Sequence, residues 1–421
     1  MQNIIAYFQT VRGLNRNAQL FLVHTVFSGL SIALLGLLYN FYVLSLDFKQ
    51  DMIGMLTLVA CAIAVVAALP VSVLLNRLGY KRALLLGVGV TTFSMLLPLW
   101  IPSGAALVVS EALWGIAYTL LLIAGAPFMT ENSSDAQRTF LFSIQFVLTM
   151  FTAFVGYVVG GALPRWIGEW IGVGAESPVA YQGALYLSAG LMILSAVPFL
   201  FIRAKEGEKH LAHVAPRYMV RKPLPIAKLL APYIVGALSA GMFVPFANVL
   251  WRTTQHVSDE TIGNIFALSA ILMVGAGIVS PMVTRRLGAA RAMVLYQSVA
   301  VGGLLAFGFV PLFSVALFGY LVRDVLMNLV RPIYGQFMMD HSEPAERAAV
   351  SALATMGFNL AWGVSSWVSG EWQSANQFVW VIAASAALSI VAIGLMQYFF
   401  GQTEPHRQAQ RITRPVGSPA E

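Results

Sequence analysis

The chain has 421 residues, of which 58% are hydrophobic and 10% are charged, and its mean hydropathy is +0.76. Soluble domains have about 45–50% apolar and about 25% charged residues, so this composition excludes a soluble globular protein. The formal net charge is +7. The Lys and Arg residues nevertheless follow membrane sidedness rather than a binding patch, so we expect a lipid bilayer as partner and no nucleic acid.

The apolar residues form long blocks, each close to the roughly 20 residues that a helix needs to cross about 30 Å of hydrocarbon. These blocks predict an all-α membrane protein with twelve transmembrane helices. In chain order, the predicted helices cover residues 18–43, 52–75, 83–101, 105–130, 139–163, 183–203, 228–251, 262–284, 291–313, 314–339, 348–370 and 377–400.

The basic residues are distributed asymmetrically over the predicted loops. If the N-terminus is cytoplasmic, nearly all of them fall on the cytoplasmic side, and only Lys49, Arg165 and Arg252 fall on the other side. This is the positive-inside pattern. It predicts a multi-pass protein of the cytoplasmic membrane with both termini in the cytoplasm.

An internal repeat organises the chain, because residue n matches residue n + 209 without a gap. Arg77-Leu78-Gly79 matches Arg286-Leu287-Gly288, and Arg82 matches Arg291. Apolar helices resemble one another by composition, so chance could supply some matches, but the charged loop pairs favour a duplication. Since each copy holds an even number of helices, the two copies should have the same orientation.

The repeat predicts the domain organisation. Residues 1–203 form an N-terminal six-helix bundle, and residues 228–400 form a C-terminal one. The polar residues 204–227 between them are expected to be a cytoplasmic linker. Residues 401–421 contain few apolar residues and are expected to be a disordered cytoplasmic tail.

Two loops carry a resemblance to a known family. The segment Asn76-Arg77-Leu78-Gly79-Tyr80-Lys81-Arg82 and its copy Arg285-Arg286-Leu287-Gly288-Ala289-Ala290-Arg291 resemble the signature loop of the major facilitator superfamily (MFS) of transporters. The resemblance extends from about Ala18 to Phe400. Asn76 and Arg285 replace the acid with which that signature begins.

The resemblance implies the MFS fold, alternating access, and a cytoplasmic gate in these loops. The candidate gate residues are Arg77, Gly79, Lys81, Arg82, Arg286, Gly288 and Arg291. The alternative is that the cations only anchor the topology while each glycine permits a tight turn. A second family signature has an arginine in the fourth helix where this chain has Glu111, and the antiporter signature of the fifth helix is only partly met, so the direction of transport stays open.

Charged side chains inside the predicted helices need a reason, because each costs about 2.5–3.5 kcal/mol at the bilayer centre on insertion scales. Asp324, Asn328 and Arg331 follow the i, i+4, i+7 pattern and should share one face of the tenth helix. Arg323 is rotated by about 100° from its neighbour, so we expect it to face elsewhere. In the fourth helix, Glu111 should share a face with aromatic residues.

That second face holds Glu111, Trp114 and Tyr118. The family resemblance implies that helices one, four, seven and ten line the central cavity, which would bring both faces to a substrate or proton pathway. The acids could titrate or bind substrate, or they could form static ion pairs. Arg323 and Arg331 could bind an anionic group, or they could only neutralise Asp324.

Other polar and aromatic residues are weaker candidates. Polar residues in lipid often only bridge helices, for about 0.6 kcal/mol each, and we expect this of His24, Asn40, Gln145, Asn248, Trp251 and Asn359. Aromatic residues near helix ends more often mark the lipid interface, and we expect this of Tyr39, Tyr42, Trp251 and Trp362.

The sequence has no phosphate-binding loop, no HExxH spacing and no nucleophile elbow. We therefore expect no enzyme, no cofactor and no metal site. The leading hypothesis is a monomeric secondary transporter that exports a small organic solute in exchange for protons. The alternative is uptake of an anionic metabolite by symport.

Overall fold

The computed structural model describes residues 13–203 and 223–401. Most of the predicted linker and nearly all of the predicted tail therefore lie outside the described residues. Within these ranges every regular element is a helix, and eleven helices are long and apolar enough to cross a membrane.

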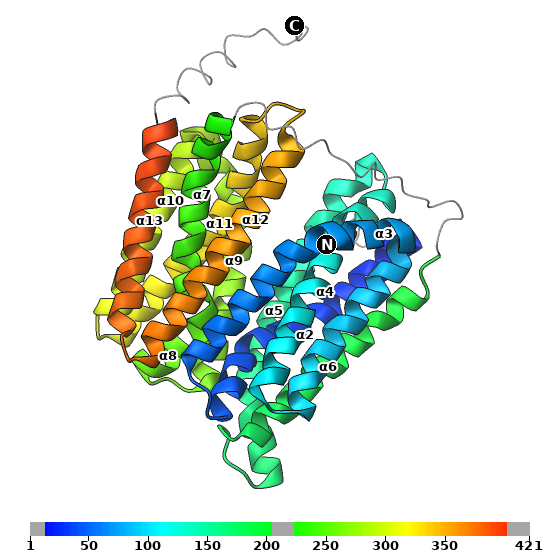
Figure 1. Ribbon diagram of the computed structural model, residues 1–421, viewed down its shortest axis with the longest axis vertical. Coiled ribbons are helices and arrows are strands. Elements are labelled where there is room, and N and C mark those ends of the chain that lie inside the picture. The colour runs from blue at the N-terminus through cyan, green and yellow to red at the C-terminus, as the bar shows by residue number, and fades with distance from the viewer. Residues whose placement is uncertain (1–12, 204–222, 402–421) are drawn as a thin grey trace, which may run out of the picture. The chain divides into compact units, whose positions relative to one another are not determined.

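The helices keep close to the predicted spans (Figure 1). They are α2 (Arg16–Ser45), α3 (Gln50–Trp100), α4 (Gly104–Glu131), α5 (Asp135–Ile171), α6 (Pro178–Leu200), α7 (Pro223–Phe243), the 3₁₀ turn η1 (Val244–Phe246), α8 (Ala247–Gln255), α9 (Asp259–Leu287), α10 (Ala289–Phe309), α11 (Phe313–Asp340), α12 (Arg347–Ser374) and α13 (Phe378–Phe400). The boundary between the ninth and tenth predicted spans lies at residues 310–312, around Pro311.

Helix α3 explains why the described residues hold eleven apolar helices instead of twelve. It covers both predicted spans 52–75 and 83–101, and its helical geometry is interrupted at Gly79 (φ 70°, ψ 167°). In one straight helix, Ala60 and Gly87 would be about 40 Å apart. Both nevertheless pack against one stretch of α4, Ala60 beside Gly115 and Gly87 beside Leu121. The chain therefore reverses at Gly79.

The repeat is visible in the backbone. Gly288, the residue at offset 209 from Gly79, has nearly the same backbone angles (φ 85°, ψ 159°), and there the helical chain divides into α9 and α10. A positive φ of this size strains any residue with a side chain, so glycine is required at both turns.

Two pairs of helices, one in each half of the chain, are joined by the same kind of reciprocal hydrogen bond. The hydroxyls of Ser31 (α2) and Ser188 (α6) each donate to the other residue's carbonyl oxygen at 2.8 Å. Ser239 (α7) and Ser385 (α13) form the same reciprocal pair at 2.7 and 2.9 Å. All four residues are buried, so each pair of bonds fixes the contact between its two helices.

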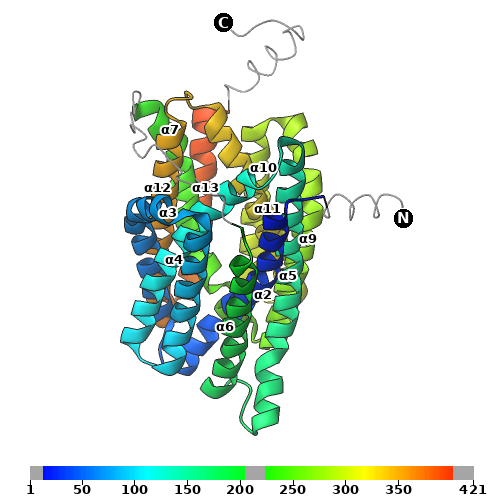
Figure 2. The same cartoon turned by 90° about the vertical axis from the view of Figure 1, so that its right-hand side faces the viewer.

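The chain divides into two compact units. Unit 1 contains α2 to α6 together with residues 245–271 and 366–376. Unit 2 contains α7, residues 272–365 and α13, and in it α7 packs on α13 while α10 packs on α11 and α13 (Figure 2). Each unit has its own apolar core, centred on residues such as Phe21, Phe128 and Phe199 in unit 1, and Tyr334 and Phe337 in unit 2.

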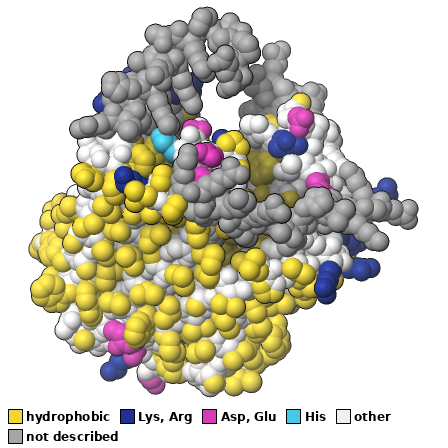
Figure 3. All heavy atoms as spheres, turned by 45° about the horizontal axis from the view of Figure 1, so that its top comes forward, with side chains coloured by type: hydrophobic (Ala, Val, Ile, Leu, Met, Phe, Trp, Pro, Cys, Tyr) yellow, Lys and Arg dark blue, Asp and Glu magenta, His cyan; other side chains and the backbone are white. Residues whose placement is uncertain are grey.

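Large apolar side chains also cover the outside. Ile278 is 72% exposed, Phe318 70% and Val66 72%. In Figure 3, hydrophobic side chains spread over much of the visible surface of the described residues, while charged side chains gather in small groups toward its margins. Such a surface would aggregate in water, so it is suited to lipid as its solvent.

Candidate functional site

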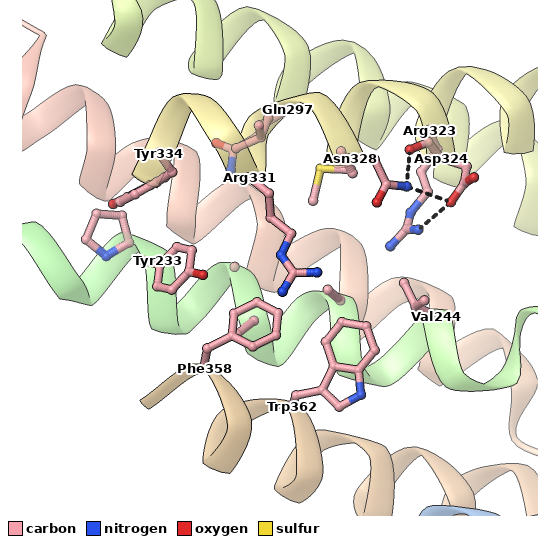
Figure 4. Close-up of a pocket in the computed structure, with 16 residues that line it drawn as sticks. Tyr233, Val244, Gln297, Arg323, Asp324, Asn328, Arg331, Tyr334, Phe358 and Trp362 are labelled. Carbon is pink, nitrogen blue, oxygen red and sulfur yellow. Dashed lines mark hydrogen bonds and ion pairs between the residues drawn. The ribbon is translucent and has the colours of Figure 1, made fainter. Parts of the chain in front are cut away.

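A cavity of about 680 Å³, partly open to solvent, lies within unit 2 and brings together three helices around the charged face of α11 (Figure 4). Besides six apolar residues and Gly236, its walls hold nine side chains with polar or aromatic groups: Tyr233 from α7, Gln297 from α10, Arg323, Asp324, Asn328, Arg331 and Tyr334 from α11, and Phe358 and Trp362 from α12.

The charged groups of α11 form one cluster at this cavity. The Asn328 side-chain amide donates to the Asp324 backbone carbonyl at 2.9 Å and to its Oδ1 at 3.3 Å. These contacts agree with the predicted shared face. The Arg323 Nη1 lies 3.9 Å from the same Oδ1. An acid, a cation and an amide therefore meet at one end of the cavity.

The position of Arg323 corrects the sequence analysis, which expected this residue to face away from Asp324. The Arg323 side chain is only 4% exposed, and its guanidinium lies 4.5 Å from the ring centroid of Phe243. The direction of its Cα–Cβ bond differs from that of Asp324, but three methylenes let the guanidinium turn back to the acid. Arg323 therefore lines the same cavity.

Arg331 extends from α11 toward an aromatic wall formed by α7 and α12 (Figure 4). Its guanidinium lies 5.0 Å from the ring centroid of Phe358, within the range of a cation–π contact. The Phe358 and Trp362 rings are stacked with centroids 5.5 Å apart, and the Tyr233 ring lies 5.4 Å from Phe358 on the other side. The wall is therefore a continuous row of rings.

Close backbone packing fixes the position of α11. A Cβ on Gly303 of α10 would lie 2.4 Å from the Gly319 carbonyl oxygen, and one on Gly319 would lie 2.4 Å from the Gly303 carbonyl oxygen. Only glycine fits on both sides of this crossing. Further along, the Tyr334 hydroxyl donates to the Leu229 carbonyl of α7 at 3.1 Å. Both contacts hold the charged face of α11 toward the cavity.

The three residues predicted to share a face of α4 do not all line one cavity. Trp114 and Tyr118 line a second cavity, of about 590 Å³ and lying within unit 1, together with His24. Glu111 is not among its lining residues. The Glu111 carboxyl instead lies beside the Tyr39 hydroxyl, which is 3.5 Å from the Ser110 hydroxyl.

Three of the six weaker polar candidates, namely His24, Asn40 and Asn248, bridge helices as expected, whereas the Asn359 amide donates to the Thr355 carbonyl of its own helix. The His24 Nδ1 lies 2.9 Å from the Ser195 carbonyl oxygen. Asn40 donates to the Pro245 carbonyl and to the Asn248 side chain, and Asn248 donates to the Leu37 carbonyl at 2.8 Å.

The interface role expected for three aromatic residues is wrong. Trp251 is 0% exposed and Tyr42 is 1% exposed, so both side chains are packed inside the protein. Trp362 faces the cavity of unit 2. The hydropathy pattern predicts how far along a helix a residue lies, but it does not predict the direction in which the side chain points. These three residues lie near predicted helix ends, yet their side chains point into the protein.

The candidate gate loops differ in their contacts. The Lys81 ammonium donates to the carbonyls of Leu200 and Ile202, both at 2.8 Å, so it caps the C-terminal end of α6. Four arginines of these loops are exposed and form no ion pair with a described residue: Arg77, Arg82, Arg286 and Arg291.

A cluster that the sequence analysis did not identify lies at the predicted outer end of unit 1. Arg252 of α8 pairs with Asp259 of α9, and their side chains are 22% and 11% exposed. The Tyr181 hydroxyl of α6 donates to Asp259 at 2.6 Å. The Arg252 guanidinium also lies 3.6 Å from the ring centroid of Phe41. No sequence spacing connects these three helices, so only tertiary structure could bring the residues together.

The cavity of unit 2 also contains residues that sequence reasoning missed, namely Tyr233, Gln297 and Phe358. Phe358 and Trp362 are four residues apart and so share a face of α12, which was a usable signal. Tyr233 and Gln297 are single polar groups in apolar helices, and nothing in their spacing connects them with α11.

Comparisons with known proteins agree with this fold. The family model described as Major Facilitator Superfamily matches residues 21–366 and, in a second match, residues 233–420. The nucleoside transporter NupG is similar in structure, with a TM-score of 0.72 at 13% identity over 91% of this chain and 99% of that chain. The structure of a NupG mutant has a TM-score of 0.73 at 15% sequence identity, and the match covers 90% of this chain and 100% of that chain.

A bacterial homolog to the human lysosomal transporter Spinster, in an inward-facing and unoccupied conformation, gives a TM-score of 0.67 at 13% identity, over 96% of this chain and 98% of that chain. At these identities the structures show the fold alone. No curated protein matches the sequence. The family model covers most of the chain, so the chain belongs to the Major Facilitator Superfamily and is a membrane transporter, not an enzyme.

Proposed function

We propose that this protein is a monomeric secondary transporter of the cytoplasmic membrane that moves a small organic solute by alternating access of two six-helix halves, residues 1–203 and 228–400. In this proposal the chain crosses the membrane twelve times, with the reversal at Gly79 separating the second and third spans and with both termini in the cytoplasm. The four exposed loop arginines and the two loop glycines then belong to the cytoplasmic gate.

The observation that carries the proposal is the cluster of Asp324, Arg323 and Asn328 at the cavity of unit 2. Asp324 combines limited exposure, 19% for its side chain, with a cation 3.9 Å away. A carboxylate in this position can exchange a proton with the cavity and can form or release its contact with Arg323 as it does so. Protonation can thus be coupled to substrate binding at the same site.

We favour export, in which protons that enter the cell drive the solute out. Glu111 is a second acid that could take part, since it lies in an apolar helix beside Tyr39. The competing proposal is uptake of an anionic solute, and a specific observation supports it: Arg323 and Arg331 both line the cavity, so two cations face the bound solute.

Transport in proteoliposomes tests the proposal. A substrate screen with and without an imposed pH gradient should identify solutes whose movement follows the gradient, and the sign of that response gives the direction. Asp324→Asn should abolish gradient-driven accumulation but retain exchange of labelled for unlabelled solute, since exchange needs no net proton movement. Asp340→Asn, at the exposed end of the same helix, is the control.

If Asp324→Asn accumulates solute against the gradient as well as the native protein does, Asp324 is not the coupling residue. If no gradient or solute produces movement through the native protein, the proposal of a proton-coupled transporter fails.

A further inference from the structure

The cavity of unit 2 contains one more positive than negative side chain. It is lined by Arg323, Arg331 and Asp324, and the acid lies near Arg323. Arg331 forms no ion pair with a described residue, and its neighbours are the Phe358 ring and the Tyr233 hydroxyl. A cation within a membrane-spanning segment is costly without a counter-charge. An anionic ligand would supply that counter-charge.

The geometry around Arg331 favours a planar anion. A guanidinium that lies over an aromatic ring keeps its N–H groups in its own plane, where they can donate two parallel hydrogen bonds to a carboxylate. The row of rings continues past Phe358 to Trp362 on one side and to Tyr233 and Tyr334 on the other, with the last two rings 4.9 Å apart. A flat apolar ligand body can stack along this row.

Two amides provide further polar contacts. Gln297 is 7% exposed and lines the cavity, and its side chain forms no hydrogen bond with another described residue. The Asn328 amide nitrogen is used by Asp324, which leaves its carbonyl oxygen as an acceptor. The Gln297 amide can both donate and accept hydrogen bonds, so it can bind a polar group of a ligand in the cavity.

We propose that the cavity of unit 2 binds a small aromatic carboxylate, with the carboxylate on the Arg331 guanidinium and the ring against Phe358 and Trp362. This inference rests on the proposed function for its role in transport, since it names the substrate class of that site. The binding itself does not require transport.

Binding to the purified full-length protein in detergent tests the proposal. The probes are benzoate, 2-naphthoate, their uncharged amides, cyclohexanecarboxylate and inorganic phosphate, and the readout is the dissociation constant from titration calorimetry. The aromatic carboxylates should bind, and 2-naphthoate should bind more tightly than benzoate because it stacks over more of the wall. The amides should bind at least about 10-fold more weakly, since hydrogen bonds to charged groups are about twice as strong as neutral ones.

Variants separate the two parts of the site. Arg331→Gln should weaken aromatic carboxylates about 10- to 100-fold and leave the amides nearly unchanged. Trp362→Leu should remove the advantage of 2-naphthoate over cyclohexanecarboxylate while a preference for carboxylate over amide remains. Arg347→Gln is the control, because it removes one positive charge from an exposed position of unit 2 outside the cavity.

Equal binding of carboxylates and amides, or an Arg331→Gln variant with native affinity for benzoate, would overturn the proposal. Phosphate binding as tight as that of 2-naphthoate would also overturn it, since the site would then respond to charge alone. Absence of transport with retained carboxylate binding would count against the proposed function only. Proton-coupled transport of another solute class without carboxylate binding would count against this inference only.

Discussion

The pair between Arg252 and Asp259, which is mostly shielded from solvent, should matter far more for stability than the neighbouring, exposed pair between Arg165 and Glu260. The two acids are adjacent in the first turn of α9. The Asp259 side chain is 11% exposed, whereas the side chains of Glu260 and Arg165 are 42% and 50% exposed. Asp259→Asn and Glu260→Gln therefore remove the same charge from two very different surroundings.

The expected magnitudes follow from burial. Removing one partner of a buried ion pair costs about 3–5 kcal/mol, because a charge is left without compensation. The Arg252 side chain is 22% exposed and keeps its contacts with the Phe41 ring and the Tyr181 hydroxyl, so we expect about 2–3 kcal/mol for Asp259→Asn. An exposed pair contributes about 0–1 kcal/mol, which is the expected cost of Glu260→Gln.

Thermal unfolding in detergent measures this difference. Cys61 is the only cysteine of the chain and lies in α3 of unit 1, so a dye that fluoresces on reaction with thiols reports when that unit opens. Asp259→Asn should lower the midpoint by at least about 4 °C, and Glu260→Gln by less than about 2 °C. A double variant, Arg252→Met with Asp259→Leu, should recover more than half of the loss, since it removes both charges.

Equal midpoints for the two single variants would refute the reasoning, because burial would then not decide the cost. A double variant as unstable as Asp259→Asn would also refute it, since the loss would come from packing instead of an unpaired cation.

Three further predictions concern the backbone and helix contacts. Gly79→Ala should destabilise the protein by about 1–3 kcal/mol and lower the unfolding midpoint accordingly, because φ is 70° at this residue. Gly89→Ala, at a helical position with open space around it, should be neutral or slightly stabilising. Gly115→Ala should destabilise the protein, because a Cβ there would lie 2.5 Å from the Ala60 carbonyl oxygen. The control Gly125→Ala should be tolerated, since its nearest contact would be an ordinary 3.6 Å. Equal unfolding midpoints for the two variants would contradict the close packing of α3 on α4. Ser188→Ala should cost only about 0.6 kcal/mol, a small fall in the same thermal assay, and a fall as large as that of Asp259→Asn would show that more than the reciprocal hydrogen bonds is lost.

The sequence was sufficient for everything that depends on local pattern. Runs of about 20 apolar residues located the helices, and the offset of 209 residues located both glycine turns, since hydropathy and a positive φ are properties of short segments. The i, i+4 spacing also predicted that Asp324 and Asn328 share a face, and the two residues are hydrogen-bonded. The predicted roles of these residues in transport await the experiments above.

Only the tertiary structure decided which helix faces meet. Helical periodicity places side chains around one axis but does not say what lies opposite them. The aromatic wall beside Arg331 comes from α7 and α12, Glu111 lies outside the cavity that Trp114 and Tyr118 line, and Asp259 meets residues of α6 and α8. The fold-back of the Arg323 side chain likewise depends on Phe243, since a long side chain takes its final direction from the groups that pack around it.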